Sequence, residues 1–320
     1  MSLTREQIDA LMQDGLAVLS AGAAEWDLTA GRLSLDVTNH VLRVYAQEGA
    51  AADVRETCLR LVGLQHADGG WGEFSTDETS GIREAAFCTR NLVTLNRRLQ
   101  DPVLAAGVER SVAYLLRQQE AEGGWLDVLW GRSDSTSIAL GALMLAGADG
   151  ICADRVPEAI RRGIAFACGM QADDGGWYDP RFKQEERLSP VAWTAHILPK
   201  IVVYQGDSTA ARRGLDLMAA AMQSDGSWDG GDVDHTCDST RALILASLVL
   251  DDDRYADQFS RGIEWLLANR SDDGLWAMLP GRPSNLLITC DVYDTLQKYR
   301  LYLNERGRAC GNVLARWDDF

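Results

Sequence analysis

The stretch RGIAFACGMQADDGGW (residues 162–177) decides the fold, because it returns along the chain in modified form. A helix-forming run leads to Gln171, two glycines follow, and Trp177 closes the unit. Similar units close at four other tryptophans, and a weaker unit surrounds a further one: Trp71, Trp125, Trp228, Trp276 and the weaker Trp26. A recurrence of about 50 residues is typical of proteins built from helical pairs. The chain is therefore predicted to be a helical repeat protein.

Each unit predicts two helices, with a glycine ending the first because glycine accepts the left-handed conformation. The predicted first helices cover residues 4–20, 53–65, 103–119, 156–171, 208–223 and 256–269. The predicted second helices cover residues 34–47, 82–98, 134–147, 190–204, 238–250 and 286–303. Polar residues near the starts of the second helices are expected to be N-caps: Asp36, Asp134, Ser189 and Asp238.

The second helices are the more apolar set, and residues 238–250 have almost no polar face. A helix that is apolar nearly all round must be buried on both sides. Six inner helices ringed by six outer ones satisfy this requirement. We therefore expect an all-α fold, an (α/α)6 barrel of six helical hairpins, with residues 1–320 forming a single domain. An open superhelix is the alternative.

Charge and cysteine content narrow the class of protein. The chain of 320 residues has a formal net charge of -16, which disfavours nucleic acid and anionic membrane surfaces as partners. No apolar run approaches the length of a membrane span. Seven cysteines without a CxxC pair suit reduced thiols, and the first residues do not read as a signal peptide. These features predict a cytoplasmic protein.

The repeat resembles the QW repeat of squalene–hopene and oxidosqualene cyclases, which is related to the repeats of protein prenyltransferase β subunits. Residues 162–177 match it almost entirely, residues 60–71 and 114–125 match well, and residues 261–276 match with Arg270 in place of the glutamine. The glutamine amide can satisfy backbone groups at a helix end while the indole packs over the turn. The repeat residues are therefore expected to be structural: Gln65, Trp71, Gln119, Trp125, Gln171 and Trp177.

Candidate catalytic residues should follow the repeat tryptophans, because the amino ends of the inner helices would gather there with partial positive charge. Asp232-Val233-Asp234-His235-Thr236 resembles the D-x-D-D-T motif of class II terpene cyclases, whose middle aspartate protonates an alkene or epoxide. The resemblance implies that Asp234 is the acid and that Asp232 and His235 modulate it. A neighbouring carboxylate would raise the acid's pKa, whereas the helix dipole would lower it.

Two other aspartates are rival acids. Aligning the units pairs Asp238 with Asp134, and residues 133–136 resemble the S-D-C-T-A acid motif of oxidosqualene cyclases. Both rivals are alternatively helix N-caps. Residues 232–235 are alternatively a solvated acidic loop.

Aromatic and basic residues are candidate substrate contacts. Carbocations are stabilised by aromatic faces, and five aromatic residues follow repeat tryptophans or lie in inner helices: Trp130, Tyr178, Phe182, Trp193 and Tyr293. Each is alternatively an ordinary core residue. Arg181 follows Trp177, and Arg83 and Arg241 are placed in first turns of inner helices, so they could bind an anionic group or pair with acidic residues.

No cofactor is firmly implied. Mg²⁺ is expected only if the substrate carries a diphosphate. His235-Thr236-Cys237 resembles a zinc-binding segment of protein prenyltransferases, but residues 187–193 lack the cysteine that would accompany it, so no metal site is predicted. Cyclases of this kind usually add a second barrel, which leaves a protein partner or a homo-oligomer as a further expectation.

The resemblance and the acidic motif together predict a class II-like terpenoid cyclase that acts on an isoprenoid substrate. Two alternatives stay open. Helical toroids also serve carbohydrate-active enzymes, whose clefts combine carboxylate pairs with tryptophans. The imperfect motif also fits a non-catalytic binding module that keeps the barrel.

Overall fold

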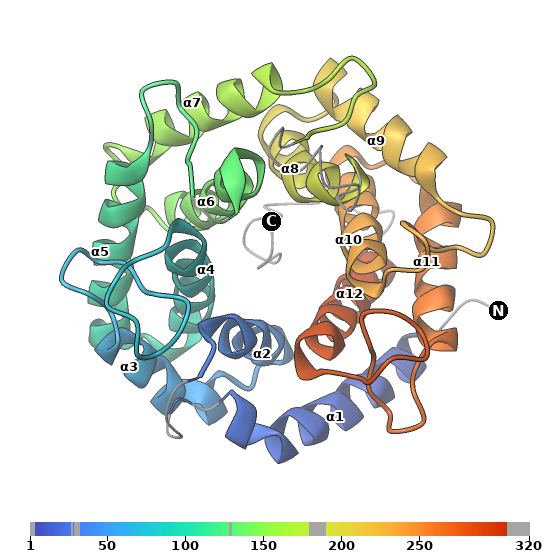
Figure 1. The fold of residues 1–320 in the computed structure, drawn as a ribbon, viewed down its shortest axis with the longest axis horizontal. Helices are drawn as coiled ribbons and strands as arrows, with labels where there is room; N and C mark the ends of the chain where they lie inside the picture. The colour runs from blue at the N-terminus through green and yellow to red at the C-terminus, as the bar shows by residue number, and fades with distance from the viewer. Residues whose placement is uncertain (1–3, 27, 29–32, 128–129, 179–189, 306–320) are drawn as a thin grey trace. The chain divides into compact units, whose positions relative to one another are not determined.

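The computed structural model describes residues 4–26, 28, 33–127, 130–178 and 190–305. These residues form twelve α-helices, labelled in Figure 1: α1 (Arg5–Ala21), α2 (Leu35–Glu48), α3 (Arg55–Gly63), α4 (Ile82–Leu99), α5 (Pro102–Gln118), α6 (Gly131–Ala148), α7 (Val156–Gly169), α8 (Pro190–Gln205), α9 (Thr209–Ala221), α10 (Val233–Leu250), α11 (Ala256–Ala268) and α12 (Leu286–Glu305). Short 3-10 helices cover Ala23–Glu25 and Ala51–Val54. No helix in the described part of the chain is long and apolar enough to cross a bilayer.

All the predicted helices are present, but two of the second helices begin earlier than expected. α6 starts at Gly131 and α10 at Val233, so Asp134 and Asp238 lie inside helices. The expected N-caps were therefore wrong at both positions, and also at Asp36, which lies in the first turn of α2. Aspartates follow one another closely before α10, and composition alone could not select the capping one. Ser189 lies outside the described residues.

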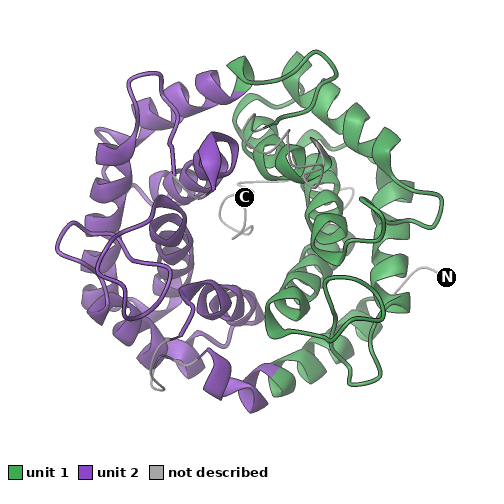
Figure 2. Cartoon of the chain, in the orientation of Figure 1, with its two compact units in different colours: residues 1–18, 168–313 green, residues 19–167, 314–320 purple. Residues whose placement is uncertain are grey.

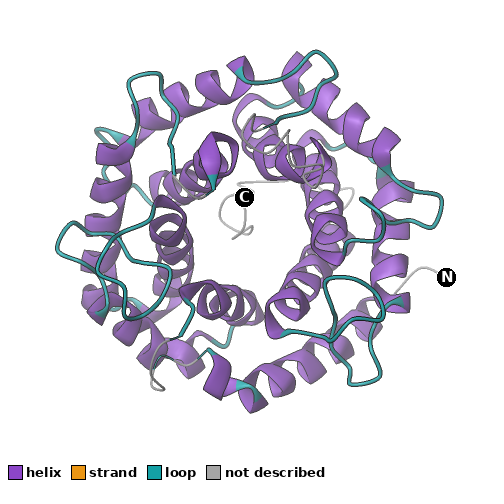
Figure 3. Ribbon diagram, in the orientation of Figure 1, coloured by secondary structure: helices purple, strands orange, loops and turns teal. Residues whose placement is uncertain are grey.

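The chain divides into two compact units (Figure 2). Unit 1 comprises residues 1–18 and 168–313, and unit 2 comprises residues 19–167 and 314–320. The prediction of a single domain is not tested by this division and stays a prediction. In unit 1 the second helices α8, α10 and α12 lie side by side, and the first helices α9 and α11 pack against them (Figure 3). α1 also lies in this unit for most of its length.

Unit 2 has the same two layers. Its second helices α2, α4 and α6 lie side by side, and α3, α5 and α7 cover one face of them. Gly163 of α7 lets the two layers approach, because a Cβ atom there would lie 2.7 Å from Leu140 of α6 and 2.9 Å from Trp125. A larger residue would have to push these helices apart.

The repeat glutamines and tryptophans form the structural clamp that the sequence predicts. Gln171 donates hydrogen bonds to the carbonyls of Gly175 (2.8 Å) and Ala210 (2.9 Å), and so ties its turn to α9. The Trp228 indole is fully buried and donates to the carbonyl of Met218 at the end of α9 (2.9 Å). Gln65, Gln119, Trp71, Trp125 and Trp276 make equivalent bonds. Arg270 replaces the glutamine and donates to Gly274 (2.7 Å).

A threonine hydroxyl sets the register of the second helices. The backbone N–H of a repeat tryptophan donates to it in α6, α8, α10 and α12, at 3.0 to 3.2 Å: Thr136, Thr194, Thr236 and Thr289. One helical turn after this threonine, the second helix packs closely against the first helix that follows it in the chain. In unit 1, a Cβ atom on Gly262 of α11 would lie 2.4 Å from the Thr240 hydroxyl of α10. This register equates Thr136 with Thr236, so Asp134 corresponds to Asp234. The expected pairing of Asp134 with Asp238 was wrong.

Candidate active site

Asp234 is the second residue of α10 in unit 1, two residues after the N-cap Asp232. Its side chain is half-buried, and none of the described residues donates a hydrogen bond to its carboxyl group or forms an ion pair with it. Burial raises the pKa of Asp234 to about 8, and the carboxylates of Asp238 and Asp291 add to the rise. A carboxyl group in this environment keeps its proton at neutral pH.

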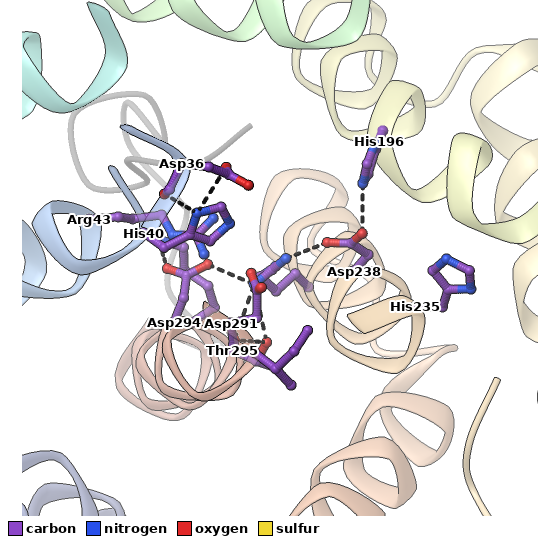
Figure 4. A network of polar contacts seen from close by, with 12 residues as sticks. Asp36, His40, Arg43, His196, His235, Asp238, Asp291, Asp294 and Thr295 are labelled. Atoms are coloured by element: carbon purple, nitrogen blue, oxygen red, sulfur yellow. Dashed lines mark hydrogen bonds and ion pairs between the residues drawn. The ribbon is translucent and has the colours of Figure 1, made fainter. Parts of the chain in front are cut away.

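Asp238 lies one helical turn below Asp234 and has the opposite electrostatic character. His196 of α8 places Nε2 2.6 Å from Asp238 Oδ2 (Figure 4). Arg241 Nη2 pairs with the other oxygen, Asp238 Oδ1. Burial would raise the pKa of Asp238, but the charges and hydrogen bonds of His196 and Arg241 hold it well below its usual range. The pKa values of two neighbouring carboxyl groups of α10 are therefore shifted in opposite directions, which favours the protonated form of Asp234 and the ionised form of Asp238.

Arg241 is in turn held by α12. Its Nη1 donates to the backbone carbonyl of Asp291 (3.1 Å), to Asp291 Oδ1 (3.2 Å) and to Asp294 Oδ2 (3.1 Å). Lys298 Nζ lies 3.2 Å from the other oxygen of Asp294, and both of these side chains are buried. We expected Arg241 in the first turn of its helix, but α10 begins at Val233, which places Arg241 in the third turn.

The two residues beside Asp234 in the motif have partners of their own. Asp232 accepts a hydrogen bond from the backbone N–H of His235 (3.1 Å) and so caps α10. His235 Nδ1 lies 2.9 Å from Asp229 Oδ2. Burial would lower the pKa of His235, but the hydrogen bond to Asp229 and the charge of Asp232 raise it to about 9. Their proposed role as modulators of Asp234 stays a prediction.

The equivalent acids in unit 2 lie beside an arginine. Arg83 of α4 places Nη1 3.2 Å from Asp36 Oδ1 and Nε 4.0 Å from Asp134 Oδ2. Burial would raise the pKa of Asp36, but His40 and Arg83 lower it. The Arg83 guanidinium also lies over the Trp130 ring, 4.3 Å from its centroid. Asp134 therefore lies beside an arginine, whereas the charged neighbour of Asp234 is His235.

The squalene–hopene cyclase C-terminal domain family matches residues 33–239, which include Asp134, Asp234 and Asp238. The chain belongs to this family.

Named relatives of this cyclase-family chain are distant and much longer. Squalene–hopene cyclase from Zymomonas mobilis is 25% identical over 200 residues, which are 52% of this chain and 28% of that cyclase. Protostadienol synthase A from Arthroderma gypseum is 30% identical over 135 residues, which are 39% of this chain and 18% of that protein. The chain thus covers less than a third of these relatives.

Solved structures share the fold of this family member at low identity. The type II terpene cyclase MstE from Scytonema has a TM-score of 0.64 at 13% identity, covering 94% of this chain and 100% of that chain. Cellobiose 2-epimerase from Spirochaeta thermophila has a TM-score of 0.72 at 12% identity, covering 94% and 96%. The predicted fold class is confirmed, because the chain shares the all-helical fold of α/α-toroid proteins. A likeness at this identity shows the fold alone.

The predicted substrate contacts of this cyclase-family chain have different surroundings. Trp193 of α8 is mostly buried, and its ring meets the His196 ring edge-on, with centroids 6.0 Å apart. The Tyr178 hydroxyl donates to Asp174 in its own turn. Tyr293 is fully buried and packs edge-on against Trp276, and its role as a substrate contact stays a prediction. Arg181 and Phe182 lie outside the described residues.

Several site residues were missed by sequence reasoning: His40, His196, Asp291, Asp294 and Lys298. Their signal was present, since charged side chains recur at helical spacing along second helices that are otherwise apolar. Asp291, Asp294 and Lys298 follow the i, i+3, i+7 pattern that places residues on one face. Buried charges in such helices require partners. The partners lie on other helices, which the sequence pattern does not identify.

Across the described ranges, no group of three or more His, Cys, Asp or Glu side chains is arranged to hold a metal ion.

Unit 2 contains a separate pocket of about 360 Å³. Glu84, Asp127 and Tyr114 are among the residues that line it. Burial raises the pKa of Glu84 to about 7.

Proposed function

We propose that this chain catalyses the protonation-initiated cyclisation of a polyprenyl substrate, with Asp234 as the general acid. The observation that carries the proposal is the environment of Asp234: a half-buried carboxyl group without a partner, one turn from an aspartate that is held ionised. An acid that is protonated at neutral pH and surrounded by little solvent is what alkene protonation requires.

The neighbouring helices favour Asp234 over the acids of unit 2. At the position of Asp234, two residues before the register threonine, the adjacent helices α8 and α12 carry Ala192 and Leu287. In unit 2 the first turn of α4 carries Arg83, which lies beside both Asp36 and Asp134. A nearby cation favours the ionised carboxylate. Asp234 has no such arginine beside it, which supports it as the proposed acid.

The proposed reaction begins when the O–H bond of Asp234 breaks and its proton adds to a terminal alkene carbon of the substrate. The alkene supplies the electron pair of the new C–H bond, and the cation left on the adjacent carbon is attacked by the next double bond. Ring closure ends when the last cation loses a proton and a double bond forms. The Asp234 carboxylate then takes a proton from solvent, so that the substrate is isomerised overall.

Aromatic side chains near the acid would stabilise the cations. Trp193 lies one turn before His196 on α8, the helix beside α10, and is proposed to face the growing ring system. A desolvated cation over such a ring gains about 2 kcal/mol. Trp130 and Tyr178 are proposed as contacts for more distant parts of a long chain.

The relatives support the proposed substrate class without establishing it. MstE was also solved, as a variant, in complex with geranylgeranyl dihydroxybenzoate, a molecule with a polyprenyl chain. The curated relatives that this chain covers in part are cyclases by name. A polyprenyl chain with a neutral or anionic head group is thus the substrate class proposed here, with Mg²⁺ needed only for a diphosphate.

The test is to incubate the protein with squalene, farnesyl diphosphate and geranylgeranyl diphosphate, with and without Mg²⁺, and to identify products by mass spectrometry. We expect a cyclised product of unchanged mass, lost in Asp234→Asn and retained in Asp257→Asn, whose side chain is exposed on α11. Release or binding of sugars with no terpenoid product would favour the carbohydrate-active alternative. Inertness toward every substrate would favour a binding module.

A further inference from the structure

We infer that Arg241 is a positioning residue for the proposed acid: it fixes the Asp238 carboxylate one turn below Asp234 and is itself held in place by two carboxylates of α12. This inference rests on the proposed role of Asp234. It assigns a task to a buried network that the reaction itself does not use.

The spacing along α10 places the three residues on one face. Asp234, Asp238 and Arg241 stand at i, i+4 and i+7, which lie above one another along a helix. Arg241 is only 8% exposed, so its guanidinium has no access to bulk solvent. It contacts Asp238 through Nη2 and α12 through Nη1. A planar fork of donors makes these contacts from two separate nitrogens in a fixed geometry, whereas an ammonium group offers all its donors from one atom.

The contacts with α12 hold the Arg241 side chain in one position. Asp294 is fully buried and shared between Arg241 (3.1 Å) and Lys298 (3.2 Å), and Lys298 is 1% exposed. A buried charge without a partner costs several kcal/mol. Moving Arg241 away would strip a partner from Asp291, Asp294 and Asp238 at once, and the guanidinium is therefore fixed where it lies.

Both oxygens of Asp238 are occupied as a result. Arg241 takes Oδ1 and His196 takes Oδ2, and the backbone carbonyl of His196 in turn accepts a hydrogen bond from Lys200 (2.8 Å). To accept a proton, Asp238 would have to give up a charge-assisted hydrogen bond. The single proton of this pair of carboxyl groups is therefore kept on Asp234.

The charged groups around this pair come from four segments: His196 and Lys200 from α8; His235 and Arg241 from α10; Asp291, Asp294 and Lys298 from α12; and Asp229 from the turn before α10. Within the described part of the chain, Arg241 is the charged residue that contacts both Asp238 and α12. It is the residue through which α12 holds the Asp238 carboxylate.

The test is a double-mutant cycle with Arg241→Gln, Asp238→Asn and both together, read by infrared spectroscopy. The signal is the carbonyl band of the protonated carboxylic acid that Asp234→Asn removes, followed as a function of pH. We expect Arg241→Gln to displace the titration of this band when Asp238 is present and to leave it unchanged when Asp238 is replaced. Equal displacement in both backgrounds, or none in either, would overturn the inference.

Two further variants serve as controls for misfolding. Arg254→Gln removes an exposed arginine that pairs with Asp252 on the surface and should leave the titration unchanged. Arg241→Lys keeps the buried charge but loses the fork. It should displace the titration in the same direction as Arg241→Gln, and a titration identical to that of the parent protein would also overturn the inference.

The readout needs no substrate, so the two proposals fail separately. If the parent protein lacks the band, or if Asp234→Asn leaves it in place, the acid assignment is wrong. If the band is present and the Arg241 variants leave its titration unaltered, the acid assignment stands and the positioning role is wrong. Where turnover is measurable, we expect Arg241→Lys to lower kcat about tenfold with KM unchanged.

Discussion

Asp134 and Asp234 occupy the same position in their hairpins, two residues before a threonine hydroxyl that accepts a hydrogen bond from a repeat tryptophan, yet Asp134 alone lies beside an arginine. Arg83 Nε is 4.0 Å from Asp134 Oδ2. One sequence position therefore carries two electrostatic states in one chain, set by the neighbouring helix.

This difference predicts how the two acids respond to substitution. Asp234→Asn should lower turnover by about 10³-fold, because an amide cannot supply the proton. Asp134→Asn should leave kcat within about twofold of the parent, because that carboxyl group takes no part in the proposed step. Initial rates, with melting temperatures as the control for folding, decide the matter. An inactive but stable Asp134→Asn protein would move the acid to unit 2.

The pH dependence of turnover should report the pKa of Asp234. The acid form is the active one, so the rate should be level below the pKa of about 8 and fall as the pH rises through it. Replacing Asp238 by Asn removes a negative charge that raises this pKa, and the fall should move to lower pH. A pH profile that is unaffected by Asp238→Asn would contradict the proposed coupling.

The same pKa shift predicts an effect on stability. A carboxyl group whose pKa is higher in the folded than in the unfolded state binds its proton more tightly when folded, so its contribution to stability decreases as the pH rises between the two values. Above the pKa of about 8, the folded protein must hold a buried, partnerless carboxylate. Asp234→Asn should therefore melt at a higher temperature than the parent at alkaline pH. A lower melting temperature there would show that Asp234 has a structural partner.

The structural clamp makes a prediction that involves no catalysis. Gln171→Ala removes the hydrogen bonds to Gly175 and Ala210 and should destabilise the fold by about 2 kcal/mol. Arg270→Gln should cost less than about 1 kcal/mol, since glutamine fills the same place in other repeats and can reach the carbonyl of Gly274. Urea unfolding of the two variants gives the comparison. Equal losses of stability in the two variants would show that glutamine cannot replace Arg270 in this repeat.

The close approach of the layers can be tested with two glycines of one helix. Gly163→Ala places a Cβ atom 2.7 Å from Leu140 and should cost about 1–3 kcal/mol through overpacking. Gly169→Ala, in the last turn of α7, meets no heavy atom within 4 Å and should be neutral or slightly stabilising. Melting temperatures measured side by side would contradict this account if the two variants lost the same stability.

Much of the architecture could be predicted because it depends on local chemistry. The glycines, the glutamine and the tryptophan of each unit act within a few residues of one another, and helical periodicity is a short-range pattern. The twelve helices, the clamp and the family resemblance were therefore correct before any contact was known. The start of α10 was misplaced because several aspartates compete for one cap and only the backbone geometry identifies Asp232. The start of α6 was misplaced because its N-cap, Trp130, makes no side-chain hydrogen bond that would mark the helix end.

The sequence by itself determined the kind of fold and the short segment in which the acid should lie. Only the tertiary structure decided the surroundings of the rival aspartates, by placing Arg83 beside Asp134 and by placing His196 and Arg241 around Asp238. The physical reason is that the proton affinity of a carboxyl group depends on burial and on charges within a few ångströms. The groups that supply those charges to Asp134 and to Asp238 lie mostly on other helices, tens of residues away in the chain.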